Sequence, residues 1–161
     1  MKTQKFLNLK FLFSGLVILF SVFVLSSCEK DKDQPDNRPY TLSGNASGTQ
    51  MVPSVSGTGD GTFTGTYDPA TGTMTYTTTW NNLTGAPTSG GFYTGASGAA
   101  GTAVGTPWVM GSGWTGTGTY SGTMDLTNDQ ANQLTSGGWY YSMGTAANTG
   151  GEIRGQISAT R

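Results

Sequence analysis

The sequence predicts an all-β fold for residues 40–161, an antiparallel Greek-key β-sandwich with one short helix near residues 128–136. Three stretches alternate large apolar or aromatic residues with threonine or serine, which is the pattern of strands that bury one face. Turn residues separate these stretches at short spacing, and one stretch carries helix signals. About 120 residues suffice for a single domain with its own core.

Three strands are predicted from this alternation. TFTGTY (residues 62–67) and TGTMTYTTTW (71–80) each set apolar or aromatic side chains against a face of threonines. The turn YDPATGT joins them, because Pro69 fixes φ and Gly72 tolerates a positive φ. GTYSGTMDL (118–126) repeats the alternation later in the chain. Each of these stretches is therefore expected to be a half-buried antiparallel strand.

The helix is predicted from its two ends. In LTNDQANQLTSGG, Thr127 precedes Gln130 by three residues, which is the spacing of a capping box. Gly137 supplies a C-terminal stop. Several short strands with one small helix late in the chain favour an immunoglobulin-like or superoxide-dismutase-like sandwich.

The first 27 residues are predicted to be a signal peptide. Three lysines precede a charge-free apolar stretch (11–25), and two serines then precede Cys28. The apolar stretch is shorter than the roughly 20 residues that a spanning helix needs. Because LSSC resembles the lipobox of bacterial lipoproteins, Cys28, the only cysteine, is the predicted lipidation site and membrane contact.

Residues 28–39 are predicted to be a disordered tether. The segment is charged, has two prolines and, after Cys28, lacks apolar residues. Lys30 and Asp31 resemble the export signal that sends Bacteroidota lipoproteins to the outer face of the outer membrane. An outer-membrane lipoprotein is therefore expected, and whether it faces the surface or the periplasm stays open.

Charge and residue types exclude several functions. Residues 40–161 carry two arginines and five carboxylates, a net charge of −3, which argues against nucleic acid as a partner. The chain has no histidine, so Ser–His and Cys–His catalysis is excluded. We expect no catalytic residue, metal or cofactor. The alternative is a hydrolase that uses Asp125 and Glu152 as its carboxylates.

Two long stretches carry a resemblance to a known family. MVP (51–53) with GTGDGTFTGTYDPATGTMTYTTTWNNLTG (57–85), and then LTNDQANQLTSGGWYYSMGTAANTGGEIRGQI (126–157), are similar to the CHRD domain of chordin and of many bacterial secreted proteins. The resemblance runs from Leu42 to Ile157. It implies an extracellular β-sandwich whose bacterial members have no settled activity.

The resemblance also shows where this chain departs from the family. Many bacterial members carry a His-x-His pair and a further histidine, and the corresponding residues here are Phe92, Thr94 and Gly144. A copper or zinc site of the superoxide dismutase kind needs imidazole ligands. Any metal function of the family is therefore expected to be lost in this chain.

The motif GGEIRGQI and the loop aromatics are the candidate functional features. Glu152 and Arg154 are two residues apart, so on a strand they share one face. We expect them to clamp the last strand, by an ion pair or by hydrogen bonds to a loop such as TAAN (145–148), with ligand contact as the alternative. Trp108 and Trp114 either plug the sandwich or contact a glycan or protein.

The predicted function follows from these features together. We expect a lipid-anchored, non-enzymatic domain of the cell envelope, with a binding or structural role and an unknown ligand. A surface glycan-binding module that uses the loop aromatics is the main alternative.

Overall fold

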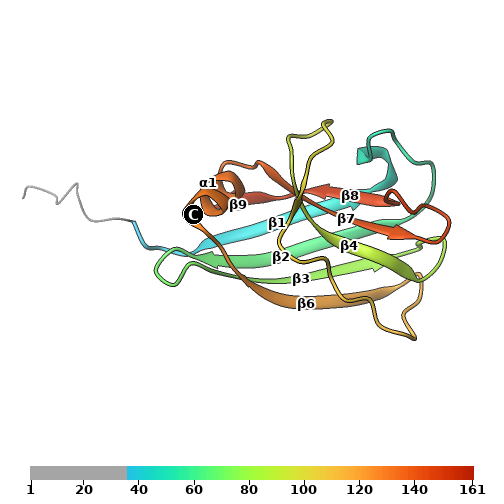
Figure 1. Ribbon diagram of the computed structural model, residues 1–161, viewed down its shortest axis with the longest axis horizontal. Helices are drawn as coiled ribbons and strands as arrows, with labels where there is room; N and C mark the ends of the chain where they lie inside the picture. Colours follow the sequence, from blue (N-terminus) through green and yellow to red (C-terminus); the bar gives the residue numbers. More distant parts are fainter. Residues whose placement is uncertain (1–35) are drawn as a thin grey trace, which may run out of the picture. The chain divides into compact units, whose positions relative to one another are not determined.

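Nine strands and one short helix account for most of the computed structural model, which describes residues 36–161 (Figure 1). Residues Asn37–Arg161 form one compact unit. The elements are β1 (Tyr40–Ser47), the 3-10 turn η2 (Gly48–Gln50), β2 (Asp60–Asp68), β3 (Thr73–Asn81), β4 (Pro87–Thr94), β5 (Ala103–Val104), β6 (Gly118–Asp125), α1 (Asn128–Thr135), β7 (Trp139–Thr145), β8 (Ile153–Gln156) and β9 (Ser158–Thr160).

The strands form one antiparallel sheet in the order β5-β4-β7-β8-β1-β2-β3-β6, with β9 added on β1. The crossovers that place β6 beside β3 and β7 beside β4 are connections of the Greek-key kind. The predicted all-β antiparallel fold is therefore confirmed. Its two halves are joined where β1 meets β8 and β9, so they belong to one curled sheet rather than two separate ones.

The core lies between the two halves of this sheet. Phe63 of β2 packs edge-on against Phe92 of β4, with ring centroids 5.8 Å apart, and Tyr76 of β3 contacts Phe92 at 4.8 Å. Tyr141 of β7 completes the contact at 5.4 Å from Phe63. Aromatic rings from both halves thus interlock, as expected for a sandwich.

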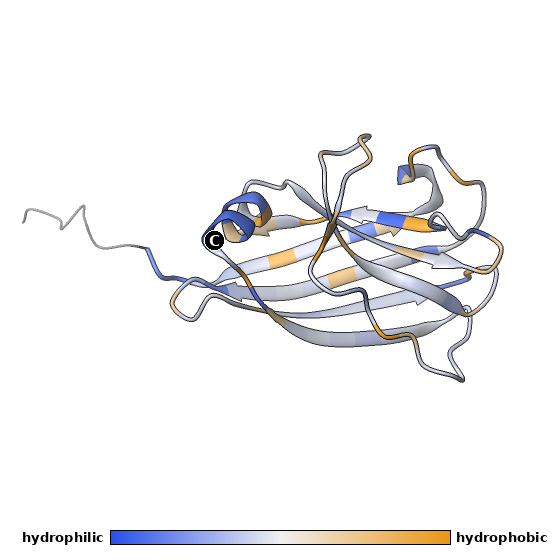
Figure 2. Ribbon diagram, in the orientation of Figure 1, coloured by the Kyte–Doolittle hydropathy of each residue, from blue (hydrophilic) through white to orange (hydrophobic). Residues whose placement is uncertain are grey.

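Strands β2, β3 and β6 confirm the alternation predicted from the sequence. On β3 the buried side chains are Met74, Tyr76, Thr78 and Trp80, and the threonines between them lie toward solvent. The register places Thr75 between Thr66 of β2 and Thr123 of β6. Figure 2 shows these strands in pale colours because glycine and threonine are nearly neutral in hydropathy.

Helix α1 begins with the predicted capping box. The hydroxyl of Thr127 accepts a hydrogen bond from the Gln130 N–H at 3.3 Å, and the Gln130 side chain accepts one from the Thr127 N–H at 2.9 Å. Gly137, just past the end, has a φ of 78°. The helix buries Ala131 and Leu134 and contacts β9.

The predicted signal peptide (1–27), Cys28 and the linker as far as residue 35 lie outside the described residues. Within residues 36–161, no helix has the length and apolarity needed to cross a membrane.

Candidate functional site

The motif that contains Glu152 and Arg154 lies where the β7–β8 connection enters β8. Glu152 occupies a bend just before the strand, and Arg154 lies within it, opposite Ser142 of β7 and Ser47 of β1. Gly151 has a φ of 121°, and a Cβ there would lie 2.4 Å from Met51 Cε. Glycine at 151 therefore permits both the turn and the close approach of Met51.

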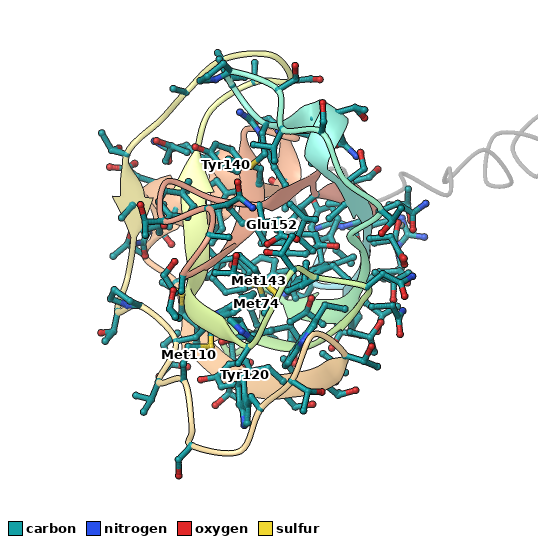
Figure 3. All side chains as sticks on the ribbon, turned by 90° about the vertical axis from the view of Figure 1, so that its right-hand side faces the viewer. Met74, Met110, Tyr120, Tyr140, Met143 and Glu152 are labelled. Carbon is teal, nitrogen blue, oxygen red and sulfur yellow. The ribbon has the colours of Figure 1, made fainter. Side chains whose placement is uncertain are left out.

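Glu152 is 2 % exposed, and both of its oxygens accept hydrogen bonds. The Thr84 N–H donates at 2.8 Å, its hydroxyl at 2.6 Å, and the Thr145 hydroxyl at 2.5 Å. Asn148 adds a longer bond from Nδ2 at 3.3 Å. Figure 3, which looks onto this end of the domain, shows Glu152 surrounded by other side chains. The carboxylate therefore holds the β3–β4 loop (82–86) to the β7–β8 loop (146–152).

The Glu152 carboxylate stays charged despite its burial. Burial alone would raise its pKa, but the hydrogen bonds from Thr145, Thr84 and Asn148 outweigh that effect and hold the pKa below its usual value. The donors favour the charged form because a carboxylate accepts hydrogen bonds more strongly than a carboxylic acid does.

Arg154 is also 2 % exposed and binds a different loop. Its Nη1 donates to the carbonyl oxygen of Ala99 at 2.7 Å, and its Nη2 donates to that of Ala96 at 2.8 Å. The guanidinium lies 3.5 Å from the ring centroid of Tyr140 on β7, within cation–π range. Arg154 thus fastens the β4–β5 loop (95–102) over the sheet.

In the described structure, Glu152 and Arg154 stabilise different loops and do not contact each other as an ion pair. Neither residue is the other's partner: the carboxylate binds hydroxyl, amide and backbone donors, and the guanidinium binds carbonyl oxygens and a ring. The expected contact of Glu152 with the TAAN loop is present through Thr145 and Asn148. Thr84, Ala96 and Ala99 were not predicted as partners, because they lie 55 or more residues from Glu152 or Arg154 and nothing in their local sequence singles them out. The Tyr140 ring was not predicted as a partner of Arg154 either.

The two carboxylates of the alternative hydrolase lie near opposite ends of β3. Asp125 accepts a hydrogen bond from Thr73, the first residue of β3, at 2.8 Å. Glu152 binds Thr84, which follows the end of the same strand. The strand spans about 26 Å at roughly 3.3 Å per residue, whereas paired glycosidase carboxylates are about 5–10 Å apart. These two acids therefore do not form such a pair.

The two loop tryptophans have different environments. Trp108 is 5 % exposed and packs in the core, stacked on Tyr120 at 5.1 Å. Trp114 is half-buried and lies 5.0 Å from Trp80, ring to ring. Trp108 is thus a core residue, as expected of a plug, whereas Trp114 lines a cleft. Ligand contact by either stays a prediction.

The cleft beside Trp114 has a volume of about 230 Å³. Its lining residues are aromatic, glycine or threonine, and none is ionisable: Trp80, Gly113, Trp114, Thr115, Thr117, Gly118 and Thr119. Trp80 is fixed by its indole N–H, which donates to the Thr115 carbonyl at 3.0 Å. A Cβ on Gly118 would lie 2.5 Å from Trp80 Cζ2, so glycine is needed there.

Phe92, Thr94 and Gly144, where the resemblance predicts that histidines have been lost, are part of the fold. Phe92 is in the core, Thr94 bonds Thr102 across the β4–β5 loop at 3.0 Å, and Gly144 pairs with Ser89. Within residues 36–161, no group of three or more acidic, histidine or cysteine side chains could hold a metal ion.

Comparison with known proteins gives one match. A family model described as the CHRD domain matches residues 42–157, from β1 to the residue that follows β8. No curated protein and no solved structure matches the chain.

Proposed function

The chain belongs to the CHRD domain family, and on that premise we propose that it is a lipid-anchored, non-enzymatic binding domain of the outer membrane. The anchor rests on the sequence: a lysine-rich start, an apolar stretch and LSSC before Cys28. Acyl chains give membrane affinity by burying methylene groups, and stable anchoring takes more than one chain. Lys30 and Asp31 resemble a signal for export to the outer face of that membrane, and the side that the domain faces stays open.

Replacement of Cys28 by serine is expected to release the protein from the membrane fraction or to leave the precursor unprocessed. The thioether bond to the lipid needs the cysteine sulfur, and a serine hydroxyl does not replace it. Cell fractionation and incorporation of labelled fatty acid measure the two consequences. Undiminished membrane association of the Cys28→Ser protein would contradict the proposal and point to an uncleaved anchor.

The ligand that fits best is a neutral carbohydrate in the cleft that Trp114 and Trp80 line. The composition of this cleft supports the proposal: the Trp114 ring is half-buried, threonines lie beside it, and no lining residue is ionisable. Sugar rings present flat C–H faces that stack on aromatic rings, and their hydroxyls exchange hydrogen bonds with hydroxyl side chains. An uncharged lining favours a neutral sugar over an acidic one. About 230 Å³ accommodates a sugar residue of a longer glycan.

Replacement of Trp114 by alanine is expected to weaken binding to neutral envelope polysaccharide by about tenfold or more, because the stacking surface is lost. Affinity electrophoresis or a glycan array measures the change. Val109→Ala is the matched control, since Val109 lies in the same loop, is 80 % exposed and does not line the cleft. Denaturation curves of both variants show whether the domain is still folded.

Two outcomes would contradict the carbohydrate proposal. One is wild-type glycan affinity in the folded Trp114→Ala variant. The other is binding by the wild type to acidic glycans alone, since the cleft offers no charge to prefer them.

A further inference from the structure

A second hollow, separate from the tryptophan cleft, lies beside Arg154. It has a volume of about 210 Å³ and is lined by the segment after η2, by the β4–β5 and β7–β8 loops, and by residues of β4, β7 and β8. The lining residues that matter to its chemistry are Met51, Val52, Tyr93, Tyr140, Gly150 and Arg154. It shares no residue with the cleft of Trp80 and Trp114.

Within the described residues, no carboxylate is among the direct contacts of the Arg154 guanidinium. Its guanidinium bonds the carbonyl oxygens of Ala96 and Ala99, and the amide oxygen of Gln156 at 3.4 Å. No carboxylate lines the hollow. A buried cation is costly unless it is paired, and here carbonyl dipoles and the Tyr140 ring supply only partial compensation. An anion in the hollow would meet a guanidinium that is already held in place.

The remaining polar side chains of the hollow are uncharged hydroxyls, those of Tyr93, Tyr140 and Ser142. The Ser142 hydroxyl already donates its proton to the Ile153 carbonyl oxygen at 3.0 Å, so the two phenols are the side-chain donors left for a ligand. The Tyr140 hydroxyl accepts a bond from the Gly101 N–H at 3.2 Å, which leaves its own proton to donate. Tyr93 stacks on Tyr140 with ring centroids 5.2 Å apart. Burial, and next the neighbouring Tyr140, raise the pKa of Tyr93, so its phenol stays a neutral donor at physiological pH.

We propose that this hollow binds a small ligand through a carboxylate group, with Arg154 as the cationic contact and the Tyr93 and Tyr140 hydroxyls as further donors. A guanidinium binds a carboxylate strongly because both groups are planar and the hydrogen bonds are charge-assisted. Met51 and Val52, the latter 41 % exposed, offer apolar contact to the rest of the ligand. A peptide C-terminus and a uronic acid share this chemistry and this size.

The test uses calorimetric titration of the full chain in detergent with two carboxylates, N-acetylalanine and glucuronate. Each is paired with a neutral counterpart, N-acetylalaninamide and glucose. We expect one carboxylate at least to bind about tenfold or more tightly than its neutral counterpart. Preference for N-acetylalanine identifies a peptide C-terminus as the source, and preference for glucuronate identifies an acidic sugar.

Gly150→Phe tests the location without touching Arg154. Gly150 lines the hollow, a Cβ there meets no atom within 4 Å, and its φ is not in the left-handed range, so a phenylalanine fits there without strain and is expected to narrow the hollow. Gly57→Phe is the matched control, because its Cβ would meet only the Gly59 nitrogen at 4.0 Å and Gly57 does not line the hollow. Carboxylate binding should fall about tenfold or more in the first variant and stay unchanged in the second.

Three results would overturn the proposal: equal binding of acid and neutral counterpart, no binding of either acid, or undiminished binding in a folded Gly150→Phe protein. Trp114→Ala is expected to leave carboxylate binding unchanged, so the outcome here is independent of the carbohydrate proposal. Tyr93→Phe keeps the ring stacked on Tyr140 and should weaken carboxylate binding several-fold through the lost hydroxyl.

Discussion

Replacement of Glu152 by leucine is expected to lower the free energy of unfolding by about 4 kcal/mol. Leucine fills a similar volume, but the Thr84 N–H, the Thr84 and Thr145 hydroxyls and Asn148 then lose their acceptor. Each buried donor left unsatisfied costs roughly 1–3 kcal/mol, and the hydroxyls can recover part of this by bonding each other. Urea denaturation followed by tryptophan fluorescence measures the loss.

Two matched variants show how much of the stability loss comes from the hydrogen bonds of Glu152 and how much from the loss of a negative charge. Asp125→Leu removes an exposed carboxylate that accepts one hydrogen bond, from Thr73, and should change stability by less than about 1 kcal/mol. Glu152→Gln keeps an acceptor for the Thr84 N–H, so its loss should be smaller than that of Glu152→Leu. Equal losses for Asp125→Leu and Glu152→Leu would contradict the role assigned to Glu152.

The same network makes stability depend on acid pH. Because folding lowers the pKa of Glu152 below its ordinary value of 4.5, the native state binds this proton less readily than the unfolded chain does. The stabilisation is therefore fully present above pH 4.5 and is lost as pH falls through the folded-state pKa. Glu152→Gln has no proton to bind, so its stability should fall less steeply over that range. Parallel pH profiles would contradict this assignment.

The fold was predictable because its signals are local. The threonine alternation on β2, β3 and β6 is visible in the sequence, and the register of β2 and β3 follows from the turn at Pro69 and Gly72. The capping box at Thr127 likewise joins residues three apart. Closure of the sheet was not predictable in the same way, since the β1–β8 contact joins Ser47 to Arg154 across most of the domain.

The site was predictable only in part. The sequence singles out Glu152 and Arg154 because they are rare charges in a neutral background, and the TAAN loop adjoins Glu152 along the chain. Thr84 is 68 residues from Glu152 and looks like any other threonine. Ala96 and Ala99 contribute backbone carbonyl oxygens. Every residue has such an oxygen, so the residue type does not indicate this role. For Trp108 the sequence left two roles open, a plug of the sandwich and a ligand contact, because a glycine-rich loop does not show whether it folds back over the core; its burial agrees with the plug.

Exchange of the two charges, Glu152→Arg together with Arg154→Glu, is expected to be at least as damaging as the two single changes combined, about 5 kcal/mol or more. A glutamate at 154 would face the carbonyl oxygens of Ala96 and Ala99, so acceptor would meet acceptor. An arginine at 152 would face the donors of Thr84 and Asn148. A loss of this size approaches the whole stability of a small domain, so the exchanged protein should fail to fold.

The milder pair Glu152→Gln and Arg154→Lys measures the coupling in folded proteins. Arg154→Lys keeps the charge but loses the forked geometry that reaches two carbonyls. Because Glu152 and Arg154 share no partner, the double variant should lose the sum of the single losses to within about 0.5 kcal/mol. An ion pair would instead make the double loss smaller than the sum, since the second change would remove an interaction already broken. If the losses of Glu152→Gln and Arg154→Lys add up in the double variant, and the charge-exchanged protein does not fold, then the two residues stabilise two loops independently. A single ion pair between them would give neither result.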